Sequence, residues 1–337
     1  MKLIIKQKGF TLLELMISLV LGLLVSAIAL QLFLTSQKST TVQQGMMNLQ
    51  NSTLFGLGGM VDSIRLANLN SSQPYIDDKV LYGGVVLSAN NISNNVTDGT
   101  SNFNVDDELL TRGGIGGSNL DGKSSDQLVI QYRVNTANQF DCEGMGLTAN
   151  DYVVERYFIR EEDDENTASK NDPNKPLVLA CKAARYTEET AKTNTSLADL
   201  EGDGVVVIPR VDHFSVRLAV AFDGASADCS SITKTEKKDD VDVITNFEPD
   251  SKLDCFSYMN IEDYRNLTIT KPQIVGVQIG LLVRSTDTTG TNKYFDENHS
   301  YRVLNVDTKL TKSDRNSLYL RSVITQTIAF RNGFGVE

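Results

Sequence analysis

The sequence of 337 residues contains no tryptophan and only two histidines, His213 and His299. It also contains no G-x-S-x-G, HExxH or Walker motif, so the familiar nucleophile, zinc and phosphate-binding signatures are missing. His213 begins a strand pattern and His299 lies in a polar loop, which favours structural roles over metal ligation or base catalysis. These absences predict a protein that is not an enzyme and needs no cofactor.

Positive charge is scarce, with 32 Lys and Arg against 43 Asp and Glu and a formal net charge of −11. Three lysines, Lys2, Lys6 and Lys8, precede Gly9, and without them the charge falls from −11 to −14. Direct binding of DNA or of an anionic membrane face needs clustered Lys and Arg. We therefore expect no direct nucleic-acid binding by the body of the protein, and no aromatic patch indicates a receptor or adhesive surface.

Proline is absent before Pro74, and the stretch from Phe10 to Leu34 contains a single charged residue, Glu14. An apolar run of about 25 residues is long enough for a helix to cross ~30 Å of hydrocarbon. The lysines before it predict, by the positive-inside rule, a cytoplasmic N-terminal end and export of everything after Leu34. An ordinary secretory signal would carry its cleavage site after the apolar run, whereas here the polar break comes before it.

Glu14 is unexpected in a membrane span, because a carboxylate in hydrocarbon costs about 2.5 kcal/mol or more and needs a partner. If the peptide bond after Gly9 is cut, the new amine at Phe10 lies one helical turn from Glu14. In a stack of such subunits the amine of one can neutralise Glu14 of a neighbour, which gives assembly a register. A plain anchor has no use for this residue.

The stretch from Lys8 to Glu14, KGFTLLE, together with the apolar run after it, resembles the N-terminal signature of the type IV pilin family. That family includes the pseudopilins of type II secretion. The resemblance implies cleavage between Gly9 and Phe10 by a membrane prepilin peptidase that also methylates the new amine of Phe10. The alternative is a signal anchor with a chance glutamate, which would belong to a membrane-anchored periplasmic binding protein or enzyme.

All four cysteines, Cys142, Cys181, Cys229 and Cys255, fall in the part expected to be exported, where thiols oxidise. They include no CxxC pair, which argues against a zinc site or a redox motif. Of the three possible connectivities we favour Cys142 with Cys181 and Cys229 with Cys255, because each pair would close a long polar insertion. The sequence leaves the pairing open.

The helical pattern continues past the membrane, with apolar residues on one face at Val42, Met46, Leu49, Leu57, Val61 and Ile64. Three glycines, Gly56, Gly58 and Gly59, are unfavourable inside a helix, so they mark either a weak point or close packing on a sheet, which we favour. The expected organisation is a leader at 1–9, a transmembrane and assembly helix at 10–34, a periplasmic continuation at 35–70 and a globular β-rich domain at 71–337.

After Pro74 the apolar period becomes that of strands, separated by polar loops. The Gly-rich segment 112–126 and the charged segments 160–175 and 234–252 are expected to be surface loops. The pattern predicts an α+β fold, in which a long N-terminal helix packs on an antiparallel β-sheet domain with long loops. The predicted strands are Val80 to Leu87, Gln127 to Val134, Tyr152 to Ile159, Pro176 to Ala180, Val205 to Ile208, His213 to Phe222, Gln273 to Arg284, Tyr301 to Val306 and Leu318 to Phe330.

The C-terminal stretches KPQIVGVQIGLLVRSTD and YLRSVITQTIAFRNGFG are similar to the end of the PilW-type minor pilins. The resemblance implies a single-pass inner-membrane protein with a periplasmic domain that joins a priming complex at the tip of a type IV pilus. Implied partners are other minor pilins, the major pilin, the prepilin peptidase, the inner-membrane assembly platform and a tip adhesin. The nearest alternative is a J-type pseudopilin of type II secretion, whose body is usually smaller.

Acidic residues could offer oxygen ligands at three places: Asp106, Asp107 and Glu108; the run from Glu161 to Glu165; and Asp239, Asp240 and Asp242. None has the EF-hand spacing, and acidic runs are usually solvated loops, so we expect no metal site. Near the C-terminus, Arg331 and Asn332 indicate a surface turn, with a contact to another minor pilin as the alternative.

Overall fold

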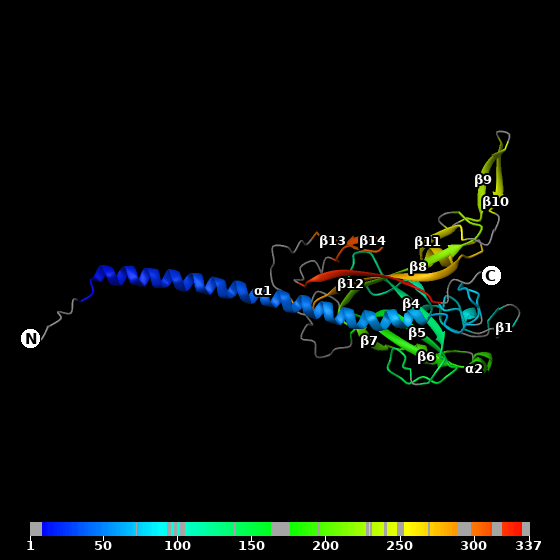
Figure 1. Ribbon diagram of the computed structural model, residues 1–337, viewed down its shortest axis with the longest axis horizontal. Coiled ribbons are helices and arrows are strands. Elements are labelled where there is room, and N and C mark those ends of the chain that lie inside the picture. The colour runs from blue at the N-terminus through cyan, green and yellow to red at the C-terminus, as the bar shows by residue number, and fades with distance from the viewer. Residues whose placement is uncertain are drawn as a thin grey trace, which may run out of the picture.

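The structure of the chain is a computed structural model. It describes residues 9–71, 73–92, 96–97, 100–101, 105–137, 139–162, 176–193, 196–226, 229, 231–238, 241–247, 253–268, 270–286, 288, 298–311 and 319–331. A single long helix leads into a body built from two antiparallel sheets, and the N-terminal half of that helix extends well beyond the body (Figure 1). The predicted α+β fold class is confirmed.

Helix α1 spans Leu12–Leu66, which is 55 residues, without a proline to kink it. It ends four residues before the predicted boundary at residue 70, because the chain turns onto the first sheet there. Asn68 and Asn70 adopt positive φ values of 64° and 56°, a conformation that asparagine tolerates well. The Asn68 backbone N–H donates to the Gln131 carbonyl, and its side-chain oxygen accepts from the Gly84 N–H at 3.0 Å.

The first sheet has five antiparallel strands in the order β3-β4-β5-β6-β7. Long, largely apolar ladders join its three central strands. Leu128 pairs with Tyr157 between β4 and β5, and Tyr152 pairs with Tyr186 between β5 and β6. The strands are β3 (Arg112–Gly116), β4 (Ser125–Arg133), β5 (Tyr152–Glu161), β6 (Leu177–Tyr186) and β7 (Val205–Ile208).

The second sheet has four antiparallel strands in the order β11-β8-β12-β15. Alternate residues of its strands are apolar and face inward, such as Val216, Leu218 and Val220 of β8, which are buried in the main core. The strands are β8 (Val211–Phe222), β11 (Cys255–Asn260), β12 (Gln273–Arg284) and β15 (Arg321–Ala329).

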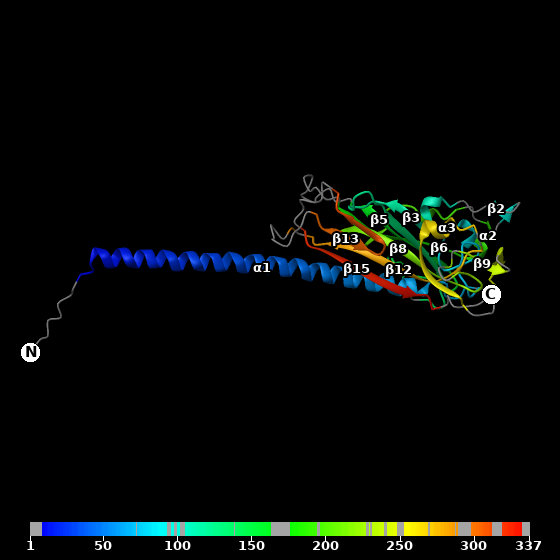
Figure 2. The same cartoon turned by 90° about the horizontal axis from the view of Figure 1, so that it is seen from above.

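Helix α1 closes the space between the two sheets along one side of the body. Its C-terminal part packs against β7 and β4 of the first sheet and β12 and β15 of the second (Figures 1 and 2). On the other side, the sheets meet directly where the Phe214 N–H donates to Ser125 Oγ and the Val216 N–H donates to Asp126 Oδ2. The main core therefore contains residues from both sheets and from the helix.

Short elements complete the described fold. The β9–β10 hairpin projects from the end of the body remote from the free end of α1 (Figure 1). The remaining elements are η1 (Ala89–Asn91), β1 (Val96–Thr97), β2 (Thr100–Ser101), η2 (Asp107–Leu109), α2 (Glu188–Thr193), η3 (Ala198–Leu200), β9 (Thr233–Lys238), β10 (Val241–Asn246), α3 (Ile261–Arg265), β13 (Ser300–Val303) and β14 (Val306–Lys309).

Two predicted strands are wrong. The segment Val80 to Leu87 is buried but forms only an isolated bridge between Val85 and Ile130, because Tyr82 adopts a φ of 63° that breaks the extended path. The segment Tyr301 to Val306 is not one strand: it contains the end of β13, a turn at 304–305 in which Leu304 has a φ of 54°, and the first residue of β14.

Two predicted loops contain strands. The start of the Gly-rich segment forms β3, which pairs with β4 through Arg112↔Gln127 and Gly116↔Ser125 around a bulge. The charged segment forms the β9–β10 hairpin, whose pairs include Lys237 with Asp242. Cross-strand partners stabilise both elements, and a pattern read along one strand does not reveal such partners.

Candidate assembly interface

The N-terminal end of the described chain is an exposed, non-helical segment followed by a capped helix. Gly9 and Phe10 lie before α1, both exposed, and residue Phe10 is 87% accessible. Residues 1–8 of the expected leader lie outside the described residues. An exposed, non-helical segment of this kind is a suitable substrate for a peptidase, since its peptide bonds are not held in a helix or a sheet.

Glu14 forms a capping box with Thr11, the N-cap residue. The Glu14 N–H donates to Thr11 Oγ1 at 3.2 Å, while Glu14 Oε2 accepts from the Thr11 N–H at 3.0 Å and from its hydroxyl at 3.2 Å. The carboxylate is therefore held at the first helical turn. Our sequence reasoning considered only the charge of Glu14 and missed the cap, although the T-x-x-E spacing just before an apolar run is its signature.

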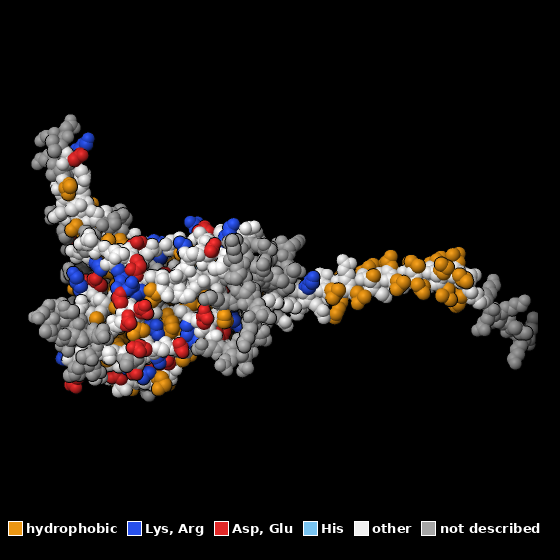
Figure 3. Space-filling model, turned by 180° about the vertical axis from the view of Figure 1, so that it is seen from behind, with side chains coloured by type: hydrophobic (Ala, Val, Ile, Leu, Met, Phe, Trp, Pro, Cys, Tyr) orange, Lys and Arg blue, Asp and Glu red, His pale blue; other side chains and the backbone are white. Residues whose placement is uncertain are grey.

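The free part of α1, residues 12–41, is exposed around its whole circumference. Figure 3 shows its apolar side chains gathered along the part of the helix that extends from the body. By length and composition, α1 is long and apolar enough to cross a membrane. So much exposed apolar surface needs lipid or other helices around it, because leaving it in water is strongly unfavourable.

The docked part of α1, residues 49–66, buries one face and exposes the other. Leu49, Val61 and Ile64 lie in the main core, as the helical spacing predicted, and Met60, which was not among the predicted residues, joins them. Met46, predicted on the same face, is exposed. The close packing expected at the glycines occurs at Gly56, where a Cβ would lie 2.4 Å from the Val207 carbonyl oxygen and 2.5 Å from Ile208 Cγ1.

Gly58 and Gly59 face the other way, and a Cβ added to either would meet nothing within 4 Å. Close packing within the subunit therefore does not explain these two glycines. Leu54 and Phe55, which precede them by one turn, are 70% and 79% exposed. We call the surface formed by Met47, Leu54, Phe55, Gly58 and Gly59 the outward stripe.

The four cysteines form two disulfides, Cys142–Cys181 and Cys229–Cys255, which is the pairing that the sequence analysis favoured. Cys142 lies in a loop, residues 139–147, which is closed by an isolated β-bridge between Phe140 and Gly146. Cys181 lies on β6. The second disulfide links the chain after β8 to the first residue of β11.

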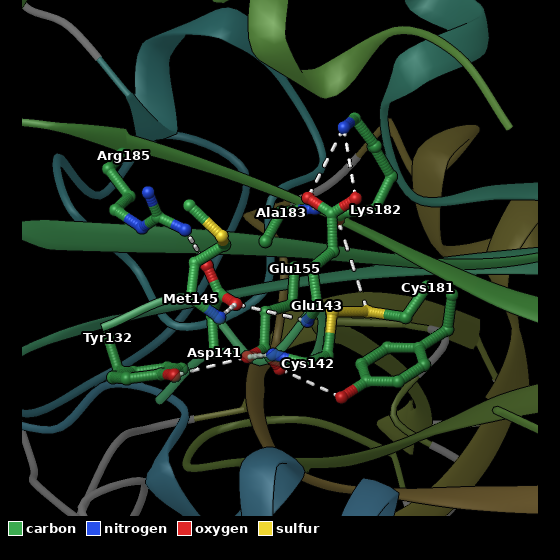
Figure 4. The surroundings of a disulfide bond; sticks show 11 residues. Tyr132, Asp141, Cys142, Glu143, Met145, Glu155, Cys181, Lys182, Ala183 and Arg185 are labelled. Atoms are coloured by element: carbon green, nitrogen blue, oxygen red, sulfur yellow. Dashed lines mark hydrogen bonds and ion pairs between the residues drawn. A yellow bond between two sulfur atoms is a disulfide. The ribbon is translucent and has the colours of Figure 1, made fainter. Parts of the chain in front are cut away.

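A buried carboxylate lies beside the first disulfide (Figure 4). Glu155 on β5 has no exposed surface and accepts hydrogen bonds from Tyr157 Oη at 2.8 Å, the Cys142 N–H at 3.0 Å and Tyr132 Oη at 3.1 Å. Burial raises the pKa of Glu155, and these donors, together with the Ser63 hydroxyl of α1, oppose that rise. We missed this residue, although a glutamate inside the apolar strand YVVERYF was a visible signal.

The two histidines lie in different surroundings. His213 is buried, and its Nδ1 lies 2.9 Å from Ser118 Oγ. Burial, with a smaller contribution from Lys123, lowers the pKa of His213 to about 4, so it is neutral at physiological pH. His299 is exposed and stacks edge-on against Tyr301.

The acidic clusters are engaged in local structure where they are described. Asp107 pairs with Arg112 and Arg265, and Asp106 caps η2. Glu162 pairs with Arg210. Residues 163–165, Asp239 and Asp240 lie outside the described residues.

Cys142, Cys181 and Glu155 lie within metal-ligand distance of one another. The two sulfur atoms are bonded to each other, so they are not available as thiolate ligands. At the C-terminal end, Arg331 is exposed in a turn after β15, and Asn332 lies outside the described residues.

A long helix with a free apolar half and a half docked on antiparallel sheets defines a type IV pilin-like protein. The family model of the prokaryotic N-terminal methylation motif matches residues 4–30. The model of the Type IV Pilus-assembly protein W matches residues 157–332, more than half of the chain. The chain belongs to the Type IV pilus-assembly protein W family, which confirms the resemblance seen in the sequence.

Among solved structures, the chain is similar to the type IV-like pilin TTHA1219 from Thermus thermophilus, with 12% identity and a TM-score of 0.27. That match covers 62% of this chain and 79% of the other. No curated protein sequence matches the chain. Family membership supports a structural, pilin-type protein that is anchored in a membrane and incorporated into a pilus.

Proposed function

We propose that this protein is a minor pilin of a type IV pilus that works in the priming complex at the fibre tip. The observation that carries the proposal is the apolar stretch of the free part, residues 12–34, which is exposed all round and bears one charge, Glu14, at a fixed place in its first turn. A monomer gains nothing from such a helix beyond an anchor. A helix of this kind suits transfer from lipid to the apolar interior of a fibre.

Chemistry is performed on this chain rather than by it. On this proposal, the prepilin peptidase hydrolyses the bond between Gly9 and Phe10 and methylates the new amine of Phe10. Residues 1–9 are then the leader and residues 10–34 span the inner membrane, while the domain after the docked part of α1 lies in the periplasm. The capping box survives this cut, because it involves only Thr11 and Glu14.

Assembly then brings helices together. The Phe10 amine of one subunit neutralises Glu14 of a neighbour, which removes the cost of an unpaired carboxylate in an apolar interior. The outward stripe carries the contact to the level of the body, where Gly58 and Gly59 let a neighbouring helix approach the backbone closely. The partners are the other minor pilins, the major pilin, the inner-membrane assembly platform and a tip adhesin.

The test is the intact mass and N-terminal sequence of the protein recovered from sheared surface fibres and from membranes. We expect a chain that begins at N-methylated Phe10 and is present in fibres at low stoichiometry. An unprocessed chain confined to membranes would contradict the proposal and favour an anchored periplasmic protein. A processed chain that never enters surface fibres would favour a J-type pseudopilin.

A further inference from the structure

The Cys142–Cys181 disulfide is connected to the docked part of α1 through Glu155. Forming the disulfide fixes the loop 139–147, whose Cys142 N–H donates to Glu155 at 3.0 Å. The same carboxylate interacts with the Ser63 hydroxyl on α1. One buried glutamate thus accepts a hydrogen bond from the disulfide loop and lies beside the Ser63 hydroxyl of the assembly helix.

Strand pairing makes a second connection, which the other disulfide lacks. Cys181 is fully buried in the main core, to which Met60 and Ile64 of α1 and both cysteines of the other disulfide also belong. Cys181 also pairs with Val205 of β7, the strand against which Gly56 packs at backbone distance. The disulfide therefore forms part of the surface on which the helix lies.

We infer that oxidation of Cys142 and Cys181 completes the docking site of α1, and that this oxidation precedes incorporation of the subunit into a fibre. Only the second statement, that oxidation precedes incorporation into a fibre, rests on the proposed function. Glu155 acts as a positioning residue, because it transmits the state of the disulfide loop to the helix without touching any other molecule.

The reaction that must come first is a thiol–disulfide exchange with a dithiol oxidoreductase in its disulfide form. A thiolate of this chain attacks the oxidant disulfide and forms a mixed disulfide; the second thiolate then attacks and releases the oxidant as a dithiol. Two electrons pass to the oxidant, and the two protons leave the two thiols. The product is the Cys142–Cys181 bond.

The second disulfide provides a matched control. Cys229–Cys255 closes a segment of comparable length, 26 residues apart against 39, so the two bonds restrict the unfolded chain to a similar degree. Its sulfur atoms face the carbonyls of Val220 and Phe222 on β8. It lies at the β8–β11 end of the second sheet rather than next to Glu155.

The first experiment compares hydrogen exchange in the full-length protein in detergent, with paired variants C142A/C181A and C229A/C255A. We expect amides 57–66 of α1 to exchange about tenfold faster in C142A/C181A and at an unchanged rate in C229A/C255A. Equal exchange of α1 in the two variants would overturn the inference. So would an increase in C142A/C181A that is uniform over the whole body.

The second experiment keeps both disulfides and changes the helix side, which covers the case in which C142A/C181A fails to fold. Coupling is reciprocal, so S63A, which removes the hydroxyl beside Glu155, should make Cys142–Cys181 easier to reduce, by about fivefold. Reduction is measured by thiol alkylation after graded dithiothreitol, with Cys229–Cys255 as the internal reference. An unchanged ratio of the two disulfides would contradict the coupling through Glu155.

The order of events is tested by trapping free thiols in membranes and in sheared fibres. We expect only the oxidised Cys142–Cys181 form in fibres, and any reduced form in membranes alone. Reduced chains in fibres would overturn the order. If the chain never enters fibres, the proposed function fails, while the exchange and reduction measurements on the purified protein still decide the coupling.

Discussion

The free and docked parts of α1 belong to one continuous helix but have opposite surroundings. The free part, residues 12–41, has no buried residue, whereas the docked part, residues 49–66, contributes Met60 and Ile64 to the core at 1% and 0% exposure. The free part is apolar around the helix as far as Leu34, and the docked part is apolar mainly at helical spacing toward the sheets. The docked part folds within the subunit, whereas the free part finds its partners in lipid and in other chains.

This difference means that the same kind of substitution should affect assembly in one part and stability in the other. A change in the free part leaves the body folded, because it removes no contact within the subunit. A change in the buried face of the docked part destabilises the body before assembly begins. The outward stripe should behave like the free part although all of it except Met47 belongs to the docked part.

The largest expected effect concerns Glu14 and separates its charge from its cap. E14Q keeps the capping box, since glutamine also accepts at this position, but removes the charge. We expect E14Q to be cleaved normally and to reach fibres at a level at least about tenfold lower, as an unpaired neighbouring amine costs more than 1.4 kcal/mol. The measurement is the ratio of processed chain in sheared fibres to that in membranes.

T11A is the matched control for this prediction. It removes the Thr11 hydroxyl from the capping box but leaves the Glu14 charge in place, so it should lower incorporation much less than E14Q. Normal incorporation of E14Q with a defect in T11A would show that Glu14 acts as a cap alone.

A smaller effect is expected from truncating an apolar side chain in the docked part. I64A should destabilise the body by about 2 to 5 kcal/mol, because Ile64 is fully buried among both sheets. L54A, ten residues before Ile64 and on the outward stripe, should change the free energy of unfolding by less than about 0.5 kcal/mol. Urea unfolding of the full-length protein in detergent measures both, and equal losses would remove the distinction between the two faces.

The sequence predicted the parts of this fold that rest on local pattern. The apolar spacing from Leu49 to Ile64 predicted the buried face of α1, and β7 and β12 have the predicted bounds, Val205–Ile208 and Gln273–Arg284. Such elements are recognisable because their residues repeat at the period of a helix or a strand along one segment.

The features that we missed depend on contacts between distant segments. Strand β3 forms where the Gly113 N–H donates to Glu262, which is far along the chain. The Gly114 N–H donates to Asp126 on the facing strand β4. The role of Glu155 likewise arises from Cys142, Tyr132 and Ser63, which meet only in the folded body. Side-chain chemistry at one position does not reveal such a meeting.

The glycines of α1 give an effect of opposite sign on the two faces. G56A should destabilise the body by about 1 to 3 kcal/mol, because its Cβ would overlap the Val207 carbonyl and Ile208. G58A meets open space, so it should stabilise the helix by up to about 1 kcal/mol. Thermal unfolding of the two variants measures this difference, and the same sign for both would contradict the packing of α1.

G58A should nonetheless impair assembly if a neighbouring helix approaches the outward stripe. Recovery of G58A in sheared fibres is therefore the companion measurement, and full recovery would argue against close helix packing at this glycine.

The smallest net effect is expected for the pH dependence of folding stability. It depends on two buried groups, His213 and Asp126, on the side of the body opposite α1, where polar groups join the sheets. The pKa of His213 is lowered by burial to about 4, below its unfolded value, so this residue destabilises the body progressively as pH falls from about 7 toward 4. The pKa of Asp126 is raised by burial to about 6, so its contribution has the opposite sign and favours the folded state as pH falls from about 7 toward 4.

Because these two contributions oppose each other, stability of the natural protein should change little between pH 7.5 and 5. H213Q should gain about 1 to 2 kcal/mol of stability over that interval, since only the Asp126 contribution remains, whereas D126N should lose about as much. Unfolding curves at the two pH values measure both variants. The free part of α1 lies away from these residues, so its membrane association should not follow the same pH dependence. If membrane association and the stability of the body changed in parallel with pH, the two parts of the molecule would be coupled through more than the docked helix.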